Sequence, residues 1–469
     1  MDAPKTTSAP AGAGYSRLSA PVRRLAPIAV LLIATLIGGL ITSSLIDERE
    51  ERQNDVREEF ARTWGPGQLV RAPVLVIPFQ SAADQPRQYL KLAPSALKNQ
   101  VGLAPETRRR GMFEATVYTA SVTMEGAFTL PSQAKLDEVR SAAGKLFLGE
   151  SFIMVETLGL SGMTERDGLV WNGETLPWQN CRQLISRDDD CQGTAAVGEY
   201  PRESSLQVNG AVVAQPAPGA MPQPNGKIAF KATMTLRGTG AFELFVPGRQ
   251  VDVRMDAPWP TPSFLGSLLP ASYNVGEKAF DAEWHAAEPT AAQQWSSSRA
   301  VDAKAWRGAS IGVQLIEATP TYRMINRASK YNVLFVTLAF TTYFLFELLS
   351  GLRIHVVQYG LLGVSLTLFG VLLLSLSETL GYTAGYGISS ALILAQASLY
   401  TASVAKRVVP VVIFSAMLAS LFGFLYVVLS LENYSLLVGS LALFVVLSVI
   451  MALTQRVDWS SAEPADKGR

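Results

Sequence analysis

The chain has 469 residues, of which 48% are hydrophobic, and its 40 basic and 39 acidic side chains give a formal net charge of +1. A balance so close to zero gives no indication of a nucleic-acid partner. Two histidines, His285 and His355, and two cysteines, Cys181 and Cys191, are too few for the usual His/Cys metal sites, so we expect no metal and no cofactor.

The N-terminal region predicts a cytoplasmic tail followed by an uncleaved anchor. Residues 1–24 begin with a stretch rich in Ala, Pro, Ser and Gly and are expected to be disordered. Residues 25–46 contain no charged side chain and are long enough to span a bilayer. They continue into Asp47-Glu48-Arg49-Glu50 without the small-residue cleavage site of a signal peptide, which indicates a transmembrane anchor helix.

Residues 47–330 predict an exported, mainly-β domain that starts with a juxtamembrane helix. Val56, Phe60 and Trp64 lie four residues apart, which is helical spacing. Strand composition and Gly/Pro turn signals favour a β-sandwich or a related antiparallel fold. The predicted strands are 74–78, 115–124, 227–236, 241–246 and 250–255, and the only clearly helical stretch is 132–149.

Cys181 and Cys191 are the only cysteines and lie in this exported domain, so they predict one disulfide. Closing so short a loop contributes about 2–3 kcal/mol in the chain-entropy model. Asp188-Asp189-Asp190 within the loop lacks the spacing and glycine of an EF-hand and indicates a solvated acidic turn.

Residues 331–455 predict a bundle of five transmembrane helices, and residues 456–469 a second cytoplasmic tail. Only seven charged side chains occur in 331–457. Because a charge at the membrane centre costs a few kcal/mol or more, the apolar runs between them are candidate spans. These runs lie near 331–352, 356–377, 381–405, 408–431 and 434–453.

The charges between these runs predict the orientation. With the 47–330 domain outside, Arg353, Lys406-Arg407 and Arg456 fall on the inner side, and Glu378 and Glu432 on the outer side. This is the positive-inside pattern, and it places both termini in the cytoplasm.

Four side chains near the ends of the apolar runs are candidate polar sites: Glu347, Arg353, His355 and Glu378. Intramembrane ionisable residues often mark a gate, a proton-responsive pair or an ion pathway. The alternative is an interfacial pair that only stabilises the structure. Gly381 and Gly385 follow Glu378 with the spacing of a small-residue helix contact.

Two further motifs have a chemical and a structural interpretation. Gly308-Ala309-Ser310-Ile311-Gly312 matches the hydrolase pattern G-x-S-x-G, but a strand-like segment follows it where a helix is required, so it indicates a chance match. The segment 259–264, WPTPSF, is either an aromatic surface for a sugar or peptide or a loop that caps the sandwich. We therefore expect no enzyme activity.

The segment 321–386 carries a resemblance to a known family. It contains TYRMINRASKYNVLFVTLAFTTYFLFELLSGLRIHVVQYGLLG and LFGVLLLSLSETLGYTAGY, and the exported half adds RAPVLVIPF at 71–79, GMFEATVYTA at 111–120 and WPTPSFLGSLLP at 259–270. Over roughly residues 25–455 the chain resembles the CreD family of bacterial inner-membrane proteins, also called cell envelope integrity proteins. The resemblance implies a link to envelope stress, the β-lactam response and colicin tolerance, and it implies no catalytic residues.

Two functions remain in competition at this stage. One is a non-enzymatic envelope protein whose periplasmic domain is a scaffold or sensor. The other is a transporter or lipid-handling protein with a path through the bundle; few polar residues and no visible internal repeat in 331–455 weaken it. The expected partners are the lipid bilayer and periplasmic or envelope components, and the oligomeric state is left open.

The orientation is testable with a reporter that is active only in the periplasm. Because Lys406-Arg407 is predicted inside, a fusion after Arg407 should be silent, whereas a fusion after Asn433 should be active. The opposite pattern of activity would eliminate the proposed orientation.

Overall fold

The computed structural model describes residues 20–451 except 86, 112, 158–161, 182–183, 185–192, 195–206, 209, 218, 222, 248–249, 288–308, 317–320, 351–354, 406–407, 432–436, 442–443, 446–447, 449–450. The chain forms two compact units. We call Arg52–Thr319 the β unit, and Met1–Glu51 together with Pro320–Arg469 the helical unit.

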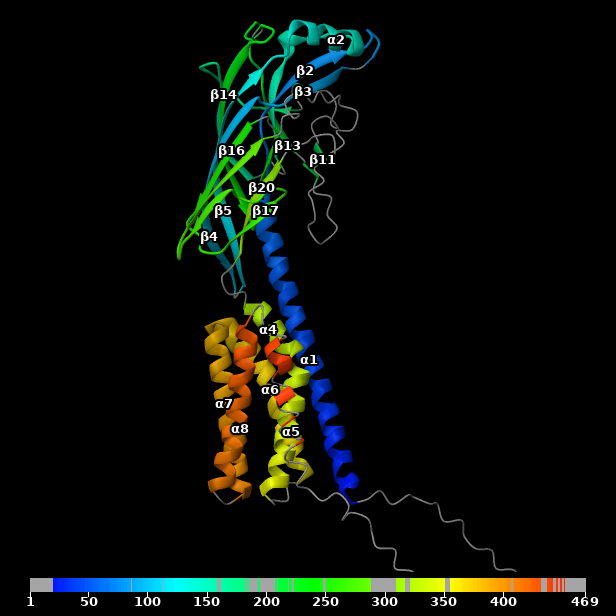
Figure 1. The fold of residues 1–469 in the computed structure, drawn as a ribbon, viewed down its shortest axis with the longest axis vertical. Coiled ribbons are helices and arrows are strands. Elements are labelled where there is room, and N and C mark those ends of the chain that lie inside the picture. The colour runs from blue at the N-terminus through cyan, green and yellow to red at the C-terminus, as the bar shows by residue number, and fades with distance from the viewer. Residues whose placement is uncertain are drawn as a thin grey trace, which may run out of the picture. The chain divides into compact units, whose positions relative to one another are not determined.

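The β unit contains two large sheets (Figure 1). The ten-stranded sheet comprises β1 (Gln68–Arg71), β2 (Val74–Gln80), β3 (Gln88–Leu92), β6 (Lys145–Leu146), β7 (Phe152–Thr157), β10 (Gln179–Asn180), β13 (Gly210–Ala214), β15 (Ala241–Val246), β17 (Pro262–Gly266) and β20 (Ala309–Leu315). The eight-stranded sheet comprises β4 (Ala96–Arg110), β5 (Phe113–Thr129), β8 (Met163–Trp171), β9 (Glu174–Leu176), β14 (Lys227–Thr239), β16 (Gln250–Ala257), β18 (Ser272–Val275) and β19 (Phe280–Ala287).

Four smaller elements accompany the two sheets in the described part of this unit, beside the C-terminal part of α1. The strands β11 (Gly193–Thr194) and β12 (Gln207–Val208) pair with each other. Helix α2 (Gln133–Ala143) is followed by the 3-10 turn η1 (Leu148–Glu150). The predicted helical stretch 132–149 is therefore too long: Gly144, with φ 93°, ends α2, and β6 follows at once.

All five predicted strand segments are strands, but the expectation of an antiparallel fold is wrong in two places. β1 pairs with β15 in parallel, and β4 pairs with β16 in parallel. Both partners lie far apart in the sequence, so a long crossover connection is available to make them parallel. Strand composition does not report the direction of a distant partner.

The two sheets share one hydrophobic core. On β14 the side chains alternate, with Ile228, Phe230, Ala232, Met234 and Leu236 buried and their neighbours more exposed. The same core contains residues of the ten-stranded sheet, such as Leu75 and Ile77 of β2. Each large apolar side chain buried in this way contributes about 1.5–3 kcal/mol, so this shared core holds the two sheets together.

The ten-stranded sheet also buries a charged cluster, Arg71–Glu156–Lys91, on β1, β7 and β3. Lys91 Nζ donates to Glu156 Oε1 at 2.8 Å, and Arg71 pairs with the other carboxylate oxygen. All three side chains are at least nine-tenths buried. Burial by itself would raise the pKa of Glu156, but the charges of Lys91 and Arg71 outweigh it and lower this pKa to about 2.

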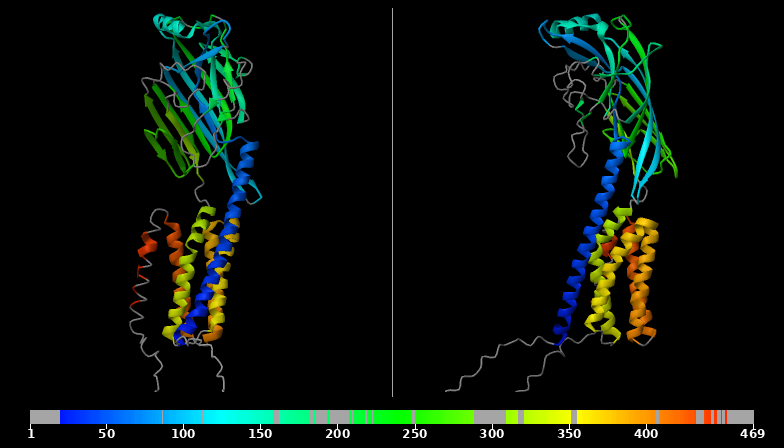
Figure 2. Two further views of the ribbon diagram at one scale, coloured as in Figure 1. Left: turned by 90° about the vertical axis from the view of Figure 1, so that its right-hand side faces the viewer. Right: turned by 180° about the vertical axis from the view of Figure 1, so that it is seen from behind.

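The helical unit contains the N-terminal part of α1 (Ala20–Thr63) and the helices α4 (Thr321–Lys330), α5 (Asn332–Ser350), α6 (Val356–Leu380), α7 (Tyr382–Ala405) and α8 (Val408–Ser430) (Figure 2). Among the described residues, three helices are long and apolar enough to cross a membrane: Pro27–Thr63 of α1, α6 and α8. The predicted five-helix bundle is not confirmed, because only four of its runs are covered by described helices, and the run 434–453 lies largely outside the described residues.

Two helices differ from the sequence prediction. The anchor at 25–46 and the juxtamembrane helix after it are one continuous helix, α1, which crosses the boundary between the units. Helix α4 was not predicted as a separate element. It is strongly amphipathic, and its Ile325 is fully buried in the core of the helical unit.

The buried cluster generates a stability prediction. Glu156→Gln leaves two buried cations without their counter-charge, so we expect a loss of about 3–5 kcal/mol in the free energy of unfolding at pH 7. Because the folded pKa of Glu156 lies below the ordinary value of 4.5, its contribution is present above about pH 4.5 and is lost as the pH falls toward 2.

Denaturant unfolding of the purified chain between pH 2 and 7 measures both effects. Glu150→Gln is the matched control, because its ion pair with Arg87 is about half exposed and should contribute no more than about 1 kcal/mol. Equal losses for the two variants would contradict a role for the buried cluster.

Candidate functional site

The helical unit contains a close contact between α1 and α6 that is made of glycines and threonines. A side chain at Gly370 would begin 2.8 Å from the Cγ2 atom of Thr42, and one at Gly38 would begin 3.0 Å from the Oγ1 atom of Thr367. Gly363 meets Thr35 in the same way. Small residues allow two backbones to approach, which is how helices associate in lipid without a hydrophobic driving force.

The hydroxyls in this contact are satisfied by their own helices. Thr35 donates to the carbonyl of Leu31 at 2.8 Å, and Thr367 donates to the carbonyl of Gly363 at 3.2 Å. The opposite face of α1 is exposed and apolar, with Val30, Ile33, Ile37, Leu40 and Ile41 all more than half exposed. This distribution suits a helix with lipid on one side and protein on the other.

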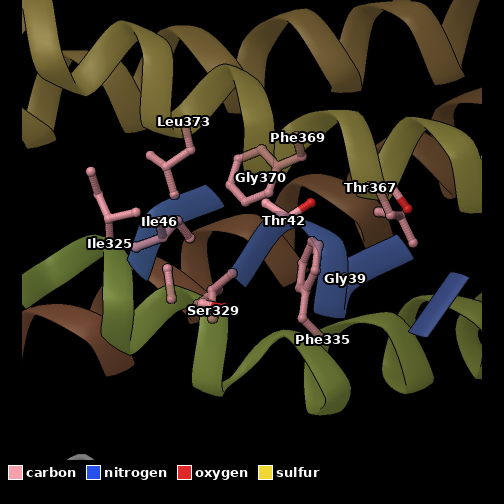
Figure 3. A pocket seen from close by; sticks show the side chains of 13 residues that line it. Gly39, Thr42, Ile46, Ile325, Ser329, Phe335, Thr367, Phe369, Gly370 and Leu373 are labelled. Carbon is pink, nitrogen blue, oxygen red and sulfur yellow. The ribbon is translucent and has the colours of Figure 1, made fainter. Parts of the chain in front are cut away.

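A small pocket lies beside this contact, between α1, α4, α5, α6 and α8 (Figure 3). Its cavity volume is about 20 Å³, which is room for little more than one water molecule. Its lining is apolar except for hydroxyls such as those of Thr42, Ser329 and Thr367. It contains no charged side chain and is too small for an apolar ligand, so it is a gap in the packing of the helices.

Two polar pairs join α1 to the other helices. Arg49 Nε lies 4.0 Å from Glu378 Oε1, and the Glu378 side chain is 8% exposed. Asn326 Nδ2 of α4 donates to Glu50 Oε2 at 3.1 Å. Glu378 was predicted as a candidate polar site, but its partner was missed. The signal was present in the sequence, since the charged segment 47–50 directly follows the anchor run.

Glu347 on α5 is half-buried and accepts a hydrogen bond from the hydroxyl of Tyr359 on α6, at 2.8 Å. The Tyr359 ring is 1% exposed and packs edge-on against Tyr343, with ring centroids 4.9 Å apart. Sequence reasoning missed both tyrosines, because aromatic residues in an apolar run are difficult to distinguish from core residues. The arrangement fixes the carboxylate between two helices.

The two basic candidates do not share this position. His355 is exposed at the start of α6, where its Nδ1 atom accepts a hydrogen bond from the backbone N–H of Val357 at 3.3 Å and caps the helix. Arg353 lies outside the described residues. A pair between Glu347 and Arg353 therefore stays a prediction.

The C-terminal part of α1 and the residues that follow it are held in the β unit. Trp64 lies between two guanidinium groups, 3.9 Å from that of Arg108 and 4.4 Å from that of Arg237. Its Nε1 donates to the carbonyl of Tyr118 at 3.3 Å, and Glu59 forms an ion pair with Arg110. Such cation–π contacts contribute about 0.5–2 kcal/mol each. Together with the ion pair they fix the C-terminal end of α1 against the strands of the β unit.

The remaining predicted features do not assemble a catalytic centre in the described part of the chain. Ser310 lies within β20, between β15 and β17, and its hydroxyl accepts from the backbone N–H of Ser267 at 3.0 Å. It therefore does not occupy the strand-to-helix turn that a hydrolase serine needs. No group of three or more His, Cys, Asp or Glu side chains suited to a metal occurs among the residues that could be searched.

Cys181 is buried and disulfide-bonded. Its predicted partner Cys191 and the acidic triplet 188–190 lie outside the described residues, so the pairing of the two cysteines stays a prediction. Trp259 is partly buried against the core, and its Nε1 donates to the carbonyl of Ile316 at 2.9 Å.

The family described as "Inner membrane protein CreD" matches residues 20–460. A curated relative with the same description, from Escherichia coli (strain K12), is 28% identical over 446 residues, which cover 92% of this chain and 91% of the relative. Among solved structures, an M1 zinc metallopeptidase from Deinococcus radiodurans overlaps with a TM-score of 0.21 at 8% identity, over 51% of this chain and 53% of the enzyme. A mutant of that enzyme overlaps equally, with a TM-score of 0.21 at 9% identity. The overlap spans about half of each enzyme, and at this TM-score it carries no argument about fold or activity.

Proposed function

Because the chain belongs to the CreD family of inner membrane proteins, we propose that it maintains the cell envelope under stress as a non-enzymatic scaffold or sensor. In this proposal the protein spans the bacterial inner membrane several times. The β unit lies in the periplasm, and both termini lie in the cytoplasm, as the positive-inside pattern favours.

One observation carries the proposal: the single helix α1 is packed into both units. In the helical unit its Thr35 and Thr42 contact glycines of α6. In the β unit its Glu59 pairs with Arg110, and the adjacent Trp64 is enclosed by two arginines. A helix is stiff over this length, so a change in either unit can be passed along it to the other without any chemical step.

The alternative is a transporter or lipid-handling protein with a path through the helices. Glu347 favours it, because a half-buried carboxylate held by Tyr359 is the type of group that carries a proton or steers a substrate. The pocket beside α1 is uncharged and only about 20 Å³ in volume, so it gives no support to a path for an ion or an apolar molecule.

The continuity of α1 at the boundary between the units is the first test. Replacing residues 52–55 by four glycines keeps the length of the chain but removes about 1 kcal/mol of helix propensity per residue relative to four alanines. We expect the alanine variant to complement a deletion strain under β-lactam or detergent stress at close to the wild-type level. The glycine variant should lose most of the complementation at equal abundance in the membrane.

Both variants lose the same four side chains, so only the helix distinguishes them. Proteolysis of membrane fractions checks that the β unit is folded in each variant. Equal complementation by the two variants would contradict signal transmission through α1.

Glu347→Gln separates the two functions. Glutamine still offers Tyr359 a carbonyl oxygen, so we expect a stability loss of only about 1 kcal/mol and normal membrane insertion. As a scaffold, the variant should keep most of its complementation. Tyr359→Phe is the matched control, since it removes the hydrogen bond and keeps the Glu347 charge. Complete loss with Glu347→Gln alone, at normal abundance, would favour the transport path.

A further inference from the structure

The eight-stranded sheet ends at an edge that no element among the described residues covers. β18 (Ser272–Val275) is its last strand and pairs with β19. All four residues of β18 are exposed. Among the described residues of the β unit, the large hydrophobic side chains that are exposed all lie in this segment: Leu269, Tyr273 and Val275, at 70%, 64% and 42%.

Two of these side chains belong to the inner face of the sheet. Tyr273 pairs with Ala282 and Val275 pairs with Phe280, and both partners are buried in the core. Paired residues of neighbouring strands point to the same face. The Tyr273 ring also contacts Phe264 of β17, with ring centroids 5.5 Å apart. The sandwich therefore presents core-type side chains to solvent at this edge, where one more strand would cover them.

The free backbone groups of β18 belong to the same two residues. The N–H of Gly276 bonds to the carbonyl of Ala279, which sets the alternation of hydrogen bonds along the β18–β19 pair. By this alternation Ser272 and Asn274 bond to β19, while the N–H and C=O groups of Tyr273 and Val275 point away from it. β18 contains no charged residue and no proline, which are common devices that protect natural edges.

The charge around the edge indicates which kind of strand would fit. The outer face of β16 and β19 and the turn before β19 carry five carboxylates against two permanent cations. The carboxylates are Asp252, Asp256, Glu277, Asp281 and Glu283, and the cations are Arg254 and Lys278. Arg254 already pairs with Asp281 and Glu283, and His285 contacts Asp252, so the excess of negative charge is what remains after these pairs. A strand added beside β18 would lie about 10 Å from β19, so a lysine or arginine side chain on it could reach the carboxylates of β19 and of the turn, whereas those of β16 lie one strand further away.

We propose that β18 is a docking edge for an extended segment of another periplasmic protein, in which apolar residues alternate with basic ones. The apolar side chains would cover Tyr273 and Val275, the backbone would complete the sheet, and the basic side chains would face the carboxylates. This inference extends the proposed scaffold function by naming the class of partner.

Two other occupants fit less well. An anionic lipid surface would be repelled by the carboxylates and has no strand to pair with the free backbone groups. A second copy of the chain, paired through the same edge, would bring its own carboxylates against these. Only a basic strand matches both the backbone and the charge.

The test uses the full chain in detergent micelles and a fluorescent nine-residue peptide that alternates lysine and valine. Fluorescence anisotropy should show binding to the wild type, with at least about tenfold weaker binding of a peptide that alternates glutamate and valine.

Val275→Pro removes the outward N–H and no bond to β19, because proline is tolerated on edge strands. It should weaken the binding of the lysine–valine peptide by about tenfold or more, whereas Val275→Thr, which keeps the N–H and the branched shape, should change it by less than about threefold. An unchanged far-UV circular dichroism spectrum controls for folding.

Any of four results would overturn the proposal. They are no binding of the lysine–valine peptide, equal binding of the two peptides, equal effects of the two Val275 variants, and a wild-type dimer in sedimentation that Val275→Pro dissociates. Hydrogen exchange adds a fifth, namely protection of 269–276 by lipid nanodiscs without peptide. Binding is measured without any growth phenotype, so this inference and the proposed function can fail independently.

Discussion

The interior of a bilayer contains no water, and this constraint determines how the helices of the helical unit pack. Backbone polar groups in that interior must be satisfied within the protein, and a hydroxyl there gains by bonding to a backbone carbonyl. The threonines of α1 and α6 therefore donate to carbonyls of their own helices, and glycines opposite them allow the two helices to approach. Apolar side chains are then free to cover the lipid-facing side of α1. In this unit the small and polar residues pack inward, which reverses the pattern of a soluble helix.

The β unit uses a different solution for its charges. Glu156 is buried, and it is stable as an anion only because Lys91 and Arg71 are both in contact with it. This cluster links β1, β3 and β7, three strands of one sheet that are not consecutive in the sequence. It contributes to the choice of a single arrangement of strands, because any arrangement that separated the three groups would leave a buried charge unpaired.

The edge at β18 differs from the rest of the β unit, because apolar side chains are exposed there. Elsewhere in the described β unit, large apolar side chains are covered, and the chain has enough core to cover them. At β18 the side chains of Tyr273 and Val275 lie on the inner face of the sheet but are exposed. The backbone groups of the same two residues point away from β19.

The sequence by itself determined the features that depend on local chemistry. The apolar run at 25–46 and the strand composition of 241–246 each report their own surroundings, so a helix long and apolar enough to cross a membrane near the N-terminus and the strand at 241–246 were predicted correctly. Tertiary structure alone decided the features that depend on distant partners. The parallel pairing of β4 with β16, the contact of Glu378 with Arg49 and that of Glu347 with Tyr359 join residues separated by 12 to more than 300 positions. A residue's own neighbours in sequence carry no record of such a partner, because the contact exists only where the packing of sheets and helices places the two side chains together.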